Sequence, residues 1–533
     1  MSTAGARWWR DAAIYQIYPR SFADDNGDGV GDLAGVRRRL GYLRDLGIDA
    51  VWFSPWFPSP MADAGYDVAD YRDIDPAFGT LPEACALIDE AHALGIRIII
   101  DIVPNHTSVA HEWFQRALTD HAYRDRFWFR DGRGALGDLP PNDWGSIFGG
   151  PAWTRVTDGQ WYLHLFDAGQ PDFNWDHPAV RAEFEDILRF WFDRGVDGIR
   201  IDSAAMVVKD PALPDFDPLS PPDPHPWNDR DELHEVYRSW RRIADAYDPP
   251  RALIGEVWLA DPQRFARYLR TDELHAAFNF DFLGCPWDAK ALRRCVDETL
   301  DAHTAVGAPA TWVLSNHDVT RHVTRYGRAE TGFDHALRQA RHLAPSDLTV
   351  GTRRARAAAL LTTALPGSVY VYQGEELGLP EVEDLPSSAR QDPIFARTAS
   401  ADPGRDGCRV PLPWSGTEPP YGFGGPGWLP QPSSWASFTV DAEAADPDSM
   451  LSLYRAALAL RRAEPGLGDA PMTWSDSPED VLAFTRPGGF ACIVNLAAHP
   501  VALPPHAAVL LASGPLDGGL LPGDTAVWLR LTA

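Results

Sequence analysis

The segment Gly198-Ile199-Arg200-Ile201-Asp202 is the part of the sequence that best indicates the fold. Its small and β-branched residues predict a short buried strand that ends at charged residues. Three other segments share this character, an apolar run that stops at polar residues: Asp101 to His106, Gly255-Glu256, and Asn316 to Asp318. A (β/α)8 barrel gathers the carboxyl ends of its parallel strands around one pocket. The recurrence therefore predicts this α/β fold, the TIM barrel, with these polar residues at its mouth.

Outward from this segment, short β-branched runs alternate with helical patterns, as βα units in a parallel sheet do. Helical stretches with one apolar face lie at Leu33 to Leu46, Pro82 to Leu94 and Val180 to Arg194. The predicted strands lie near Ala13 to Tyr18, Ala50 to Ser54, Arg97 to Val103, Gly198 to Asp202, Ala252 to Val257, Ala276 to Asp281, Thr311 to Leu314 and Ser368 to Tyr372.

Two regions depart from this alternation. Clusters of Trp, Gly, Pro and Asp after the third strand predict an insertion domain, and short alternating apolar segments near the C-terminus predict a small antiparallel β-sandwich. We therefore expect a catalytic barrel of residues 1–105 and 173–465, an insertion domain of residues 106–172 and a C-terminal domain of residues 466–533. Within the barrel, the Pro-, Gly- and Ser-rich stretch from Glu381 to about Asp446 predicts a long loop over the pocket mouth.

Composition narrows the choice of partner and location. The formal net charge is -27, which argues against binding to nucleic acid or an anionic membrane, because both attract a basic face. No apolar run reaches the ~18 residues of a membrane helix, and Met1 to Arg10 lacks the pattern of a signal peptide, so we expect a cytoplasmic protein. Five scattered cysteines argue against a disulfide framework and predict buried thiols.

The polar strand ends carry residues suited to acid, base and nucleophilic chemistry. Arg200 and Asp202 are two apart on a strand and share a face, and the arginine would keep the aspartate ionised as a nucleophile. Glu256, crowded by other carboxylates, would have the raised pKa of a general acid. Asp318 adds a third carboxylate beside an imidazole. Each has a simpler alternative: a structural Arg–Asp pair, a solvated glutamate and a helix cap. Together they favour a site that cleaves sugars.

Four segments of the sequence resemble the motifs of a known enzyme family. Asp101-Ile-Val-Pro-Asn-His106, Gly198-Ile-Arg-Ile-Asp202, Gly255-Glu256-Val-Trp258 and Asn316-His317-Asp318 resemble the ordered motifs of the α-amylase superfamily, glycoside hydrolase family 13. Gln170-Pro-Asp-Phe-Asn-Trp175 is similar to the motif of its oligo-1,6-glucosidase and α-glucosidase branch, and so is Tyr15 to Phe22.

By motif position, the resemblance implies Asp202 as nucleophile, Glu256 as acid/base and Asp318 as stabiliser of the transition state. It further implies that four residues bind the sugar unit before the scissile bond: Asp67, His106, Arg200 and His317. Phe166 would be the aromatic side chain that lines this pocket. Arg409, in Arg409-Val-Pro-Leu-Pro-Trp414, resembles the arginine of an Arg-Thr-Pro-Met-Gln-Trp motif, although only Arg, Pro and Trp are shared. With Asp67, it would hold the hydroxyls at the non-reducing end.

A loop near the N-terminus has the pattern of a cation site. Its oxygen donors alternate along the chain, with Gly29 for a sharp turn and a backbone carbonyl at Val30, as Ca²⁺ or Mg²⁺ prefers. The candidate ligands are Asp24, Asn26, Asp28, Val30 and Asp32. Gly35 stands where an EF-hand has glutamate, and an Asx-rich turn is the alternative. The ion would stabilise the loop without taking part in catalysis. We expect no organic cofactor, and no His-x-His or His-Glu-x-x-His spacing makes His106 or His317 a metal ligand.

The resulting hypothesis is a retaining, exo-acting α-glucosidase that removes glucose from short neutral α-glucosides. The small Ser203 after Asp202 favours α-1,4 linkages, because α-1,6-preferring relatives usually carry valine there. One rival is a transglucosylase or isomerase of the same family, of the trehalose synthase, sucrose isomerase or amylosucrase type. A remoter one is a non-catalytic glucosidase-like protein, such as the heavy subunit of an amino-acid transporter. The sequence gives no oligomeric state.

Overall fold

Eight parallel strands form the central sheet of the computed structural model, which describes residues 3–532. Their spatial order, β10-β11-β1-β2-β3-β7-β8-β9, follows the chain once around a barrel. The strands are β1 (Ala13–Ile17), β2 (Ala50–Phe53), β3 (Arg97–Ile102), β7 (Gly198–Ile201), β8 (Ala252–Gly255), β9 (Ala276–Ala277), β10 (Thr311–Val313) and β11 (Ser368–Tyr372). Each lies where the sequence predicts a strand, so the barrel prediction is confirmed.

Side chains bridge the two edge strands of this sheet. Strand β9 has two residues, although the sequence predicts a strand as far as Asp281. It ends early because the Asn279 side chain accepts a hydrogen bond from the amide of Phe282 and so caps α7 (Phe280–Gly284). In β10, the Thr311 hydroxyl donates to the carbonyl of Ala277 at 2.6 Å and accepts from the amide of Asn279 at 3.2 Å. These bonds nearly close the barrel.

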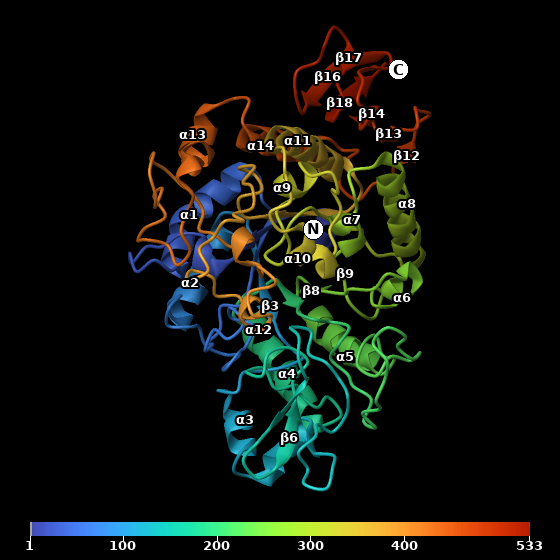
Figure 1. Cartoon of the computed structure of the whole chain (residues 1–533). Helices are drawn as coiled ribbons and strands as arrows, with labels where there is room; N and C mark the ends of the chain where they lie inside the picture. Colours follow the sequence, from blue (N-terminus) through green and yellow to red (C-terminus); the bar gives the residue numbers. More distant parts are fainter. Residues whose placement is uncertain (1–2, 533) are drawn as a thin grey trace.

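Helices cover the outside of the sheet and pack their apolar faces on it (Figure 1). Their ends follow capping rules: Thr80 and Glu83 form a capping box at the start of α2, and Gly47 ends α1 at a φ of 96°. The main helices are α1 (Leu33–Leu46), α2 (Leu81–Ala93), α4 (Pro178–Phe192), α5 (Leu233–Asp245), α6 (Pro262–Arg267), α8 (Ala289–Val306), α9 (His322–Tyr326), α10 (Arg338–Arg341), α11 (Leu348–Ala364), α12 (Pro393–Arg397), α13 (Val440–Ala445) and α14 (Met450–Ala463).

An insertion domain follows β3 and projects below the barrel in Figure 1. Its three-stranded antiparallel sheet has the order β4-β6-β5. The chain leaves and re-enters the barrel side by side, because His106 pairs with Asp172 and Phe127 with Phe173 in antiparallel bridges. The elements are α3 (Glu112–Ala117), β4 (Phe129–Asp131), β5 (Trp153–Arg155) and β6 (Gln160–Leu163).

The loop after β7 holds the insertion domain in place. The Arg133 Nη1 donates to Asp215 Oδ2 at 2.8 Å, and the Trp144 indole donates to the Pro214 carbonyl at 2.8 Å. The insertion domain therefore has two attachments, its own chain ends and this loop, which fix it beside the carboxyl ends of the strands.

The C-terminal part is an antiparallel sheet of order β12-β13-β14-β18-β16, at the top of Figure 1. It packs on α11, where the buried Trp528 donates its indole N–H to the Leu360 carbonyl at 3.1 Å. Its strands are β12 (Thr473–Trp474), β13 (Val481–Arg486), β14 (Phe490–Asn495), β16 (His506–Ala512) and β18 (Thr525–Leu531), with a separate pair β15 (Val501–Ala502) and β17 (Leu520–Leu521). The residue limits predicted for the three domains stay predictions.

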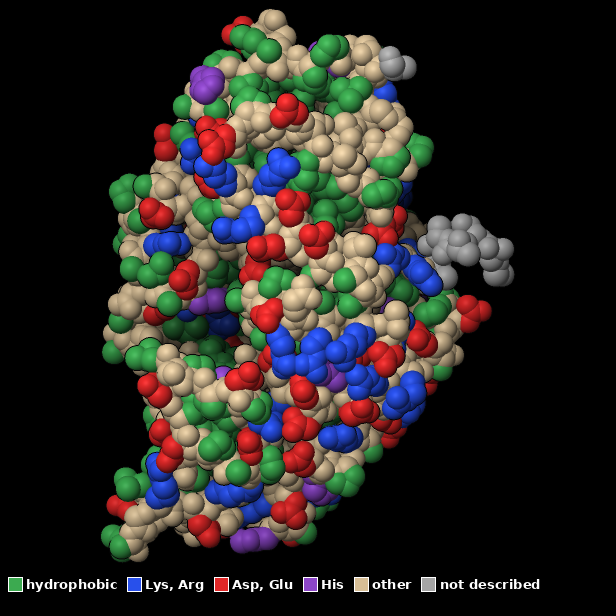
Figure 2. Space-filling model, turned by 90° about the vertical axis from the view of Figure 1, so that its right-hand side faces the viewer, with side chains coloured by type: hydrophobic (Ala, Val, Ile, Leu, Met, Phe, Trp, Pro, Cys, Tyr) green, Lys and Arg blue, Asp and Glu red, His purple; other side chains and the backbone are tan. Residues whose placement is uncertain are grey.

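Two further observations concern the molecule as a whole. Among residues 3–532, none of the helices combines the length and apolar character needed to cross a membrane. On the face shown in Figure 2, acidic and basic side chains are interspersed, and a hollow with apolar walls opens at mid-height. Four of the cysteines are buried, as expected: Cys285, Cys295, Cys408 and Cys492.

Candidate active site

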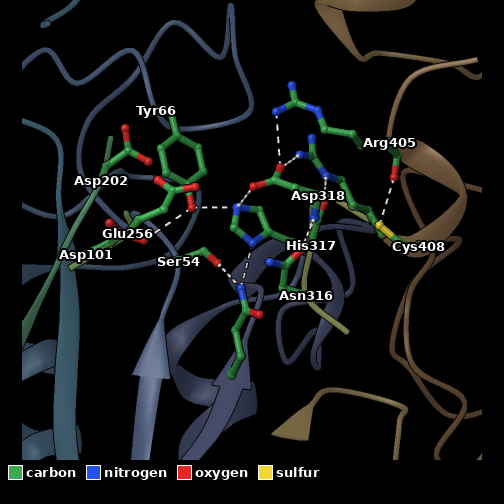
Figure 3. A network of polar contacts seen from close by, with 12 residues as sticks. Ser54, Tyr66, Asp101, Asp202, Glu256, Asn316, His317, Asp318, Arg405 and Cys408 are labelled. Carbon is green, nitrogen blue, oxygen red and sulfur yellow. Dashed lines mark hydrogen bonds and ion pairs between the residues drawn. The ribbon is translucent and has the colours of Figure 1, made fainter. Parts of the chain in front are cut away.

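Three carboxylates from different strands face one space at the carboxyl end of the barrel (Figure 3). Asp202 directly follows β7, Glu256 directly follows β8, and Asp318 lies in the loop after β10. Asp202 and Glu256 retain 7% and 9% of their accessible surface, so both are nearly removed from bulk water. The barrel therefore brings together the three residues that the sequence singles out for catalysis.

One guanidinium ties two of these carboxylates together. Arg200 Nη1 lies 2.8 Å from Asp202 Oδ1, and its Nη2 lies 2.8 Å from Glu256 Oε2. Nη1 also pairs with Asp101 Oδ1 at 2.9 Å. Arg200 is 2% exposed, so these pairs form in a dry environment where charge interactions are strong. The alternative of a purely structural Arg–Asp pair does not account for the third partner, Glu256.

Ser203 makes a second link between the same two carboxylates. Its backbone is left-handed, with a φ of 46°, which turns its amide N–H toward Glu256 Oε2 at 2.8 Å. Its hydroxyl donates to Asp202 Oδ2 at 2.9 Å. The Trp258 indole donates to the other Glu256 oxygen at 3.1 Å. Both carboxylates are thus held in fixed orientations.

The surroundings push the pKa of Glu256 upward. Burial is the main cause, and the negative charges of Asp202 and Asp318 add to it while Arg200 opposes it, so the pKa of Glu256 reaches about 7. Burial also raises the pKa of Asp202, but Arg200 and the Ser203 hydroxyl stabilise its ionised form. One carboxyl can therefore hold a proton near neutral pH beside another that accepts two hydrogen bonds as an anion.

Asp318 is surrounded by cationic side chains. Its Oδ1 accepts from Arg409 at 2.9 Å and from Arg405 at 3.2 Å. Burial alone would raise the pKa of Asp318, but neighbouring groups outweigh burial and lower it below its ordinary value. His317 lies 3.3 Å away and is neutral near pH 7, because burial lowers its own pKa to about 3. We therefore assign the lowered pKa of Asp318 to the arginines, which keep it ionised.

His317 lies at the centre of the network drawn in Figure 3. Its Nδ1 lies 2.7 Å from the Gln16 amide nitrogen, and its Nε2 lies 2.6 Å from the Tyr66 hydroxyl. The Tyr66 hydroxyl also donates to Asp101 Oδ2 at 3.2 Å. This chain connects Asp318 to the Arg200 cluster through neutral groups and fixes the ring of His317.

His106 and Phe166 form the wall contributed by the insertion. Their ring centroids are 4.8 Å apart, and the His106 Nε2 lies 3.0 Å from the Gln170 amide nitrogen. Burial lowers the pKa of His106 to about 4, so the imidazole is neutral near pH 7. Gln170 belongs to the branch motif identified in the sequence, which places that motif in contact with the site.

Asp67, predicted to bind the sugar, lies beneath the pocket surface in this structure. It is fully buried, and its carboxylate is occupied by the Ser59 hydroxyl and the amides of Ala62 and Asp63. These contacts hold a turn, and the role of Asp67 in sugar binding stays a prediction. Asp63, in the same loop, is 4% exposed, and its Oδ1 lies 2.7 Å from Arg405 Nη2. Asp67 thus closes the turn that presents Asp63 to Arg405.

Arg409, predicted to hold sugar hydroxyls, is engaged by groups of the protein in this structure, and its role at the sugar stays a prediction. It is 1% exposed, donates from Nε to the His317 carbonyl at 2.8 Å and reaches only the back of Asp318. Arg405 occupies the exposed side, where it contacts Asp63, Asp318 and Asp392. Arg409 therefore holds Asp318 from behind.

Sequence reasoning missed Asp63, Arg405 and Tyr66 as parts of the site. The signals were present: Asp63 lies in the same short loop as Gly65-Tyr66, and Arg405 precedes Arg409 by four residues. A spacing alone does not show which carboxylate accepts the amides of a turn and which pairs with an arginine, so these contacts of Asp67 and Asp63 required the structure.

A cavity of about 660 Å³ leads to the carboxylates. It is lined by Glu256 and Asp318 together with aromatic side chains from the insertion and from the loops after β7 and β8: Phe148, Phe166, Trp227 and Trp258. Ile394 and Thr398 of the long loop complete the wall, and Arg397 of this loop pairs with Asp167 at 3.2 Å. The insertion and the long loop therefore meet over the cavity, as the sequence indicates.

The predicted cation loop is held by the amides of the protein itself. Asp24 accepts from the amides of Gly27, Gly29 and Gly425, at 2.7 to 2.9 Å. Asp32 similarly accepts from three amides and caps α1. In residues 3–532, groups of three or more His, Cys, Asp or Glu side chains that could hold a metal are absent. Since the predicted ligands include Asn26 and the Val30 carbonyl, this absence leaves the ion a prediction.

Comparison with known proteins agrees with this geometry. Residues 16–470 match the family model of the alpha amylase catalytic domain. A probable alpha-glucosidase of Rhizobium meliloti is 38% identical over 521 residues, which cover 92% of this chain and 89% of the relative. The crystal structure of an alpha-glucosyl transfer enzyme, XgtA, superposes with a TM-score of 0.86 at 36% identity, covering 98% and 99% of the two chains.

A second solved structure is similar to the same extent. The trehalulose synthase MutB from Pseudomonas mesoacidophila superposes with a TM-score of 0.85 at 30% identity, and the match covers 98% of this chain and 99% of that chain. Proteins named alpha-glucosidase, alpha-glucosyl transfer enzyme and trehalulose synthase therefore share this architecture. The chain belongs to glycoside hydrolase family 13, the α-amylase superfamily, in its oligo-1,6-glucosidase and α-glucosidase branch.

Proposed function

We propose that the protein is a retaining, exo-acting α-glucosidase of short oligosaccharides. The observation that carries the proposal is the Arg200 bridge, which holds Asp202 and Glu256 side by side while the pKa of Glu256 is raised to about 7. Retaining glycosidases need two such carboxyl groups about 5 Å apart, one ionised and one protonated.

In the proposed first step, an Asp202 oxygen attacks the anomeric carbon while Glu256 gives its proton to the departing glycosidic oxygen. A glucosyl ester forms on Asp202 and the leaving sugar departs as an alcohol. In the second step, Glu256 takes a proton from water, the water oxygen attacks the anomeric carbon and Asp202 leaves as carboxylate. Asp318, kept ionised, would accept hydrogen bonds from ring hydroxyls and offset positive charge at the anomeric carbon.

The walls of the cavity support a short, neutral substrate. The Asp63–Arg405 pair and the Phe166 side of the insertion narrow the space around the carboxylates, which favours a terminal sugar unit. Two arginines on the wall are already paired: Arg338 with Asp402 at 2.9 Å and Arg405 with Asp63 at 2.7 Å. A substrate with an anionic group would have to displace these partners, at a cost in affinity.

Three finer predictions accompany the proposal. The small Ser203 supports a preference for α-1,4 linkages, because it leaves room where a branched side chain would crowd the leaving group. The cation of the Asp24 loop would act on stability alone. The expected cytoplasmic location rests on the sequence.

Transfer of glucose to a sugar acceptor is the second candidate. It is supported by the similarity to XgtA and MutB and by the aromatic wall of Phe148, Trp227 and Trp258, which would suit stacking of an acceptor sugar. Acceptor and water would use the same glucosyl ester, so the catalytic residues would be unchanged. The two activities differ only in what occupies the cavity when Glu256 acts as base.

Hydrolysis of p-nitrophenyl α-glucoside tests the proposal. We expect nitrophenol release by the wild type and a loss of about 10⁴-fold or more in the Asp202→Ala variant. Asp176→Ala, at an exposed loop position, serves as the matched control. Product analysis at high maltose concentration then separates the candidates: glucose alone supports hydrolysis, and new disaccharides support transfer. A wild type without release, or an Asp202→Ala variant with full activity, would refute both and favour the non-catalytic alternative.

A further inference from the structure

Lys209 is a buried charged group that the proposed reaction does not use. It is one of two lysines in the sequence, lies in the loop after β7 and is 1% exposed. Its Nζ pairs with Asp172 Oδ2 at 2.9 Å and donates to Asn105 Oδ1 at 2.5 Å. Asp172 itself has no accessible surface. Burying such a pair costs solvation free energy, and Asp172 Oδ2 accepts no hydrogen bond within residues 3–532, so the attraction of the ammonium is what offsets this cost.

Each partner of Lys209 is directly connected to a side chain of the cavity wall. The Asn105 amide nitrogen lies 3.0 Å from His106 Nδ1. The second oxygen of Asp172 accepts from the amide of Leu165 at 3.1 Å, and Leu165 precedes Phe166. The rings of His106 and Phe166 then meet at 4.8 Å. Two routes therefore lead from one ammonium to the same pair of rings.

We propose that Lys209 is a positioning residue, which orients His106 through Asn105 and Phe166 through Asp172 for binding of the sugar. By accepting from the ammonium, the Asn105 oxygen is held away from the imidazole, and the amide NH₂ faces Nδ1. The Gln170 amide nitrogen lies 3.0 Å from the other ring nitrogen, Nε2, so Asn105 and Gln170 hold the ring of His106 between them.

Location strengthens this assignment. Lys209 comes from the barrel, Asn105 ends the chain that leaves it, and Asp172 lies where the chain returns from the insertion. The bridge between His106 and Asp172 and the bond from the Phe173 amide to the Asn105 carbonyl, at 3.1 Å, surround the ammonium. The ion pair is thus placed at the junction that sets the distance between the insertion wall and the barrel carboxylates.

The test uses a charge-matched pair of substitutions. Lys209→Met alone leaves the buried Asp172 carboxylate without its partner and can unfold the chain. The double variant Lys209→Met/Asp172→Asn removes both charges, and the asparagine oxygen can still accept from Leu165. Lys290→Met is the matched control, because Lys290 is the other lysine and its side chain is 67% exposed.

The proposal rests on the proposed function for its kinetic assay. We expect the double variant to keep the thermal midpoint of the control and to lose about tenfold or more in kcat/KM on p-nitrophenyl α-glucoside. When the double variant is combined with His106→Ala, the fold-loss in kcat/KM should be much smaller than the product of the two separate fold-losses, because both changes act on the same ring. An unchanged kcat/KM, or losses that multiply fully, would overturn the positioning role.

A binding readout keeps the two proposals distinguishable. If the wild type releases no nitrophenol, the proposed function fails, and affinity for the glucose mimic 1-deoxynojirimycin is measured by calorimetry instead. We expect the double variant to bind it about tenfold more weakly than Lys290→Met does. Equal affinities would overturn the role of Lys209 independently of catalysis.

Discussion

Replacing Arg200 with methionine should destabilise the protein in a way that depends on pH. Arg200 is 2% exposed and contacts Asp101, Asp202 and Glu256, whose exposed fractions are 1%, 7% and 9%. Removing one partner from a buried ion pair costs about 3–5 kcal/mol, because the remaining charge is left without compensation. Since three carboxylates share this one cation, we expect a loss of at least about 3 kcal/mol in the free energy of unfolding at pH 8.

The sign of the pH effect follows from proton uptake. Burial already raises the pKa of Asp101 and Glu256, and Arg200 opposes this in both. Without Arg200 these values rise further. A carboxyl with a higher pKa in the folded chain adds stability that is complete below its unfolded pKa and is lost as the pH rises through its folded pKa. The variant should therefore regain roughly half of its loss at pH 5.

The assay is urea unfolding of the variant and wild type at pH 5 and pH 8, followed by tryptophan fluorescence. Arg189→Met is the control, because the Arg189 side chain is 46% exposed and its ion pairs are on the surface, where such pairs contribute about 0–1 kcal/mol. A loss below about 1 kcal/mol, or one of equal size at both pH values, would show that Arg200 is not the shared counter-charge of the three carboxylates.

Three further outcomes follow from the site and its supports. Glu256→Gln should lower kcat/KM about 10²–10⁴-fold and abolish the fall in activity above pH 7 that loss of the Glu256 proton causes. Measured pH–rate profiles check this prediction. If the variant showed the same fall in activity at alkaline pH, that fall would belong to another group. Asp24→Ala should lower the free energy of unfolding by about 2–4 kcal/mol, since it removes the acceptor of three backbone amides. Melting curves of variant and wild type with Ca²⁺ and with EGTA check this. A destabilisation seen with Ca²⁺ but not with EGTA would make the ion the main support of the loop. Initial rates should give maltose a higher kcat/KM than isomaltose, and Ser203→Val should shift the ratio toward isomaltose; an unchanged ratio would remove Ser203 as a determinant of linkage.

The barrel could be predicted because its signal is local and repeated. Each strand is a short β-branched run whose polar end is visible in the sequence, as in Ile199 to Asp202. The edge strand β9 is the exception: Ala276 to Asp281 is apolar enough for a longer strand, but the capping hydrogen bond of Asn279 starts a helix there. Competition between a cap and a strand depends on packing, which the sequence does not show.

The candidate site could be predicted only in part, for a similar reason. Asp202, Glu256 and Asp318 stand at strand ends, so topology alone brings them together. Asp63 and Arg405 lie in irregular loops far apart in the chain, and their contact at 2.7 Å depends on how two loops fold over the barrel. Asp67 and Arg409 fit the motifs, and in the structure Asp67 closes a turn while Arg409 contacts Asp318 and the His317 carbonyl, so their contacts with the sugar stay predictions. A motif gives the residue type, and the hydrogen bonds decide which residue faces the substrate.

The most direct test of the central claim is to trap the glucosyl ester. Incubation with 5-fluoro-α-D-glucosyl fluoride, followed by proteolysis and mass spectrometry, should add one fluoroglucosyl group to the peptide that contains Asp202, at the side chain of that residue. A label on another carboxylate would contradict the account, and so would steady turnover of this compound to a product of inverted anomeric configuration with Asp202 unmodified.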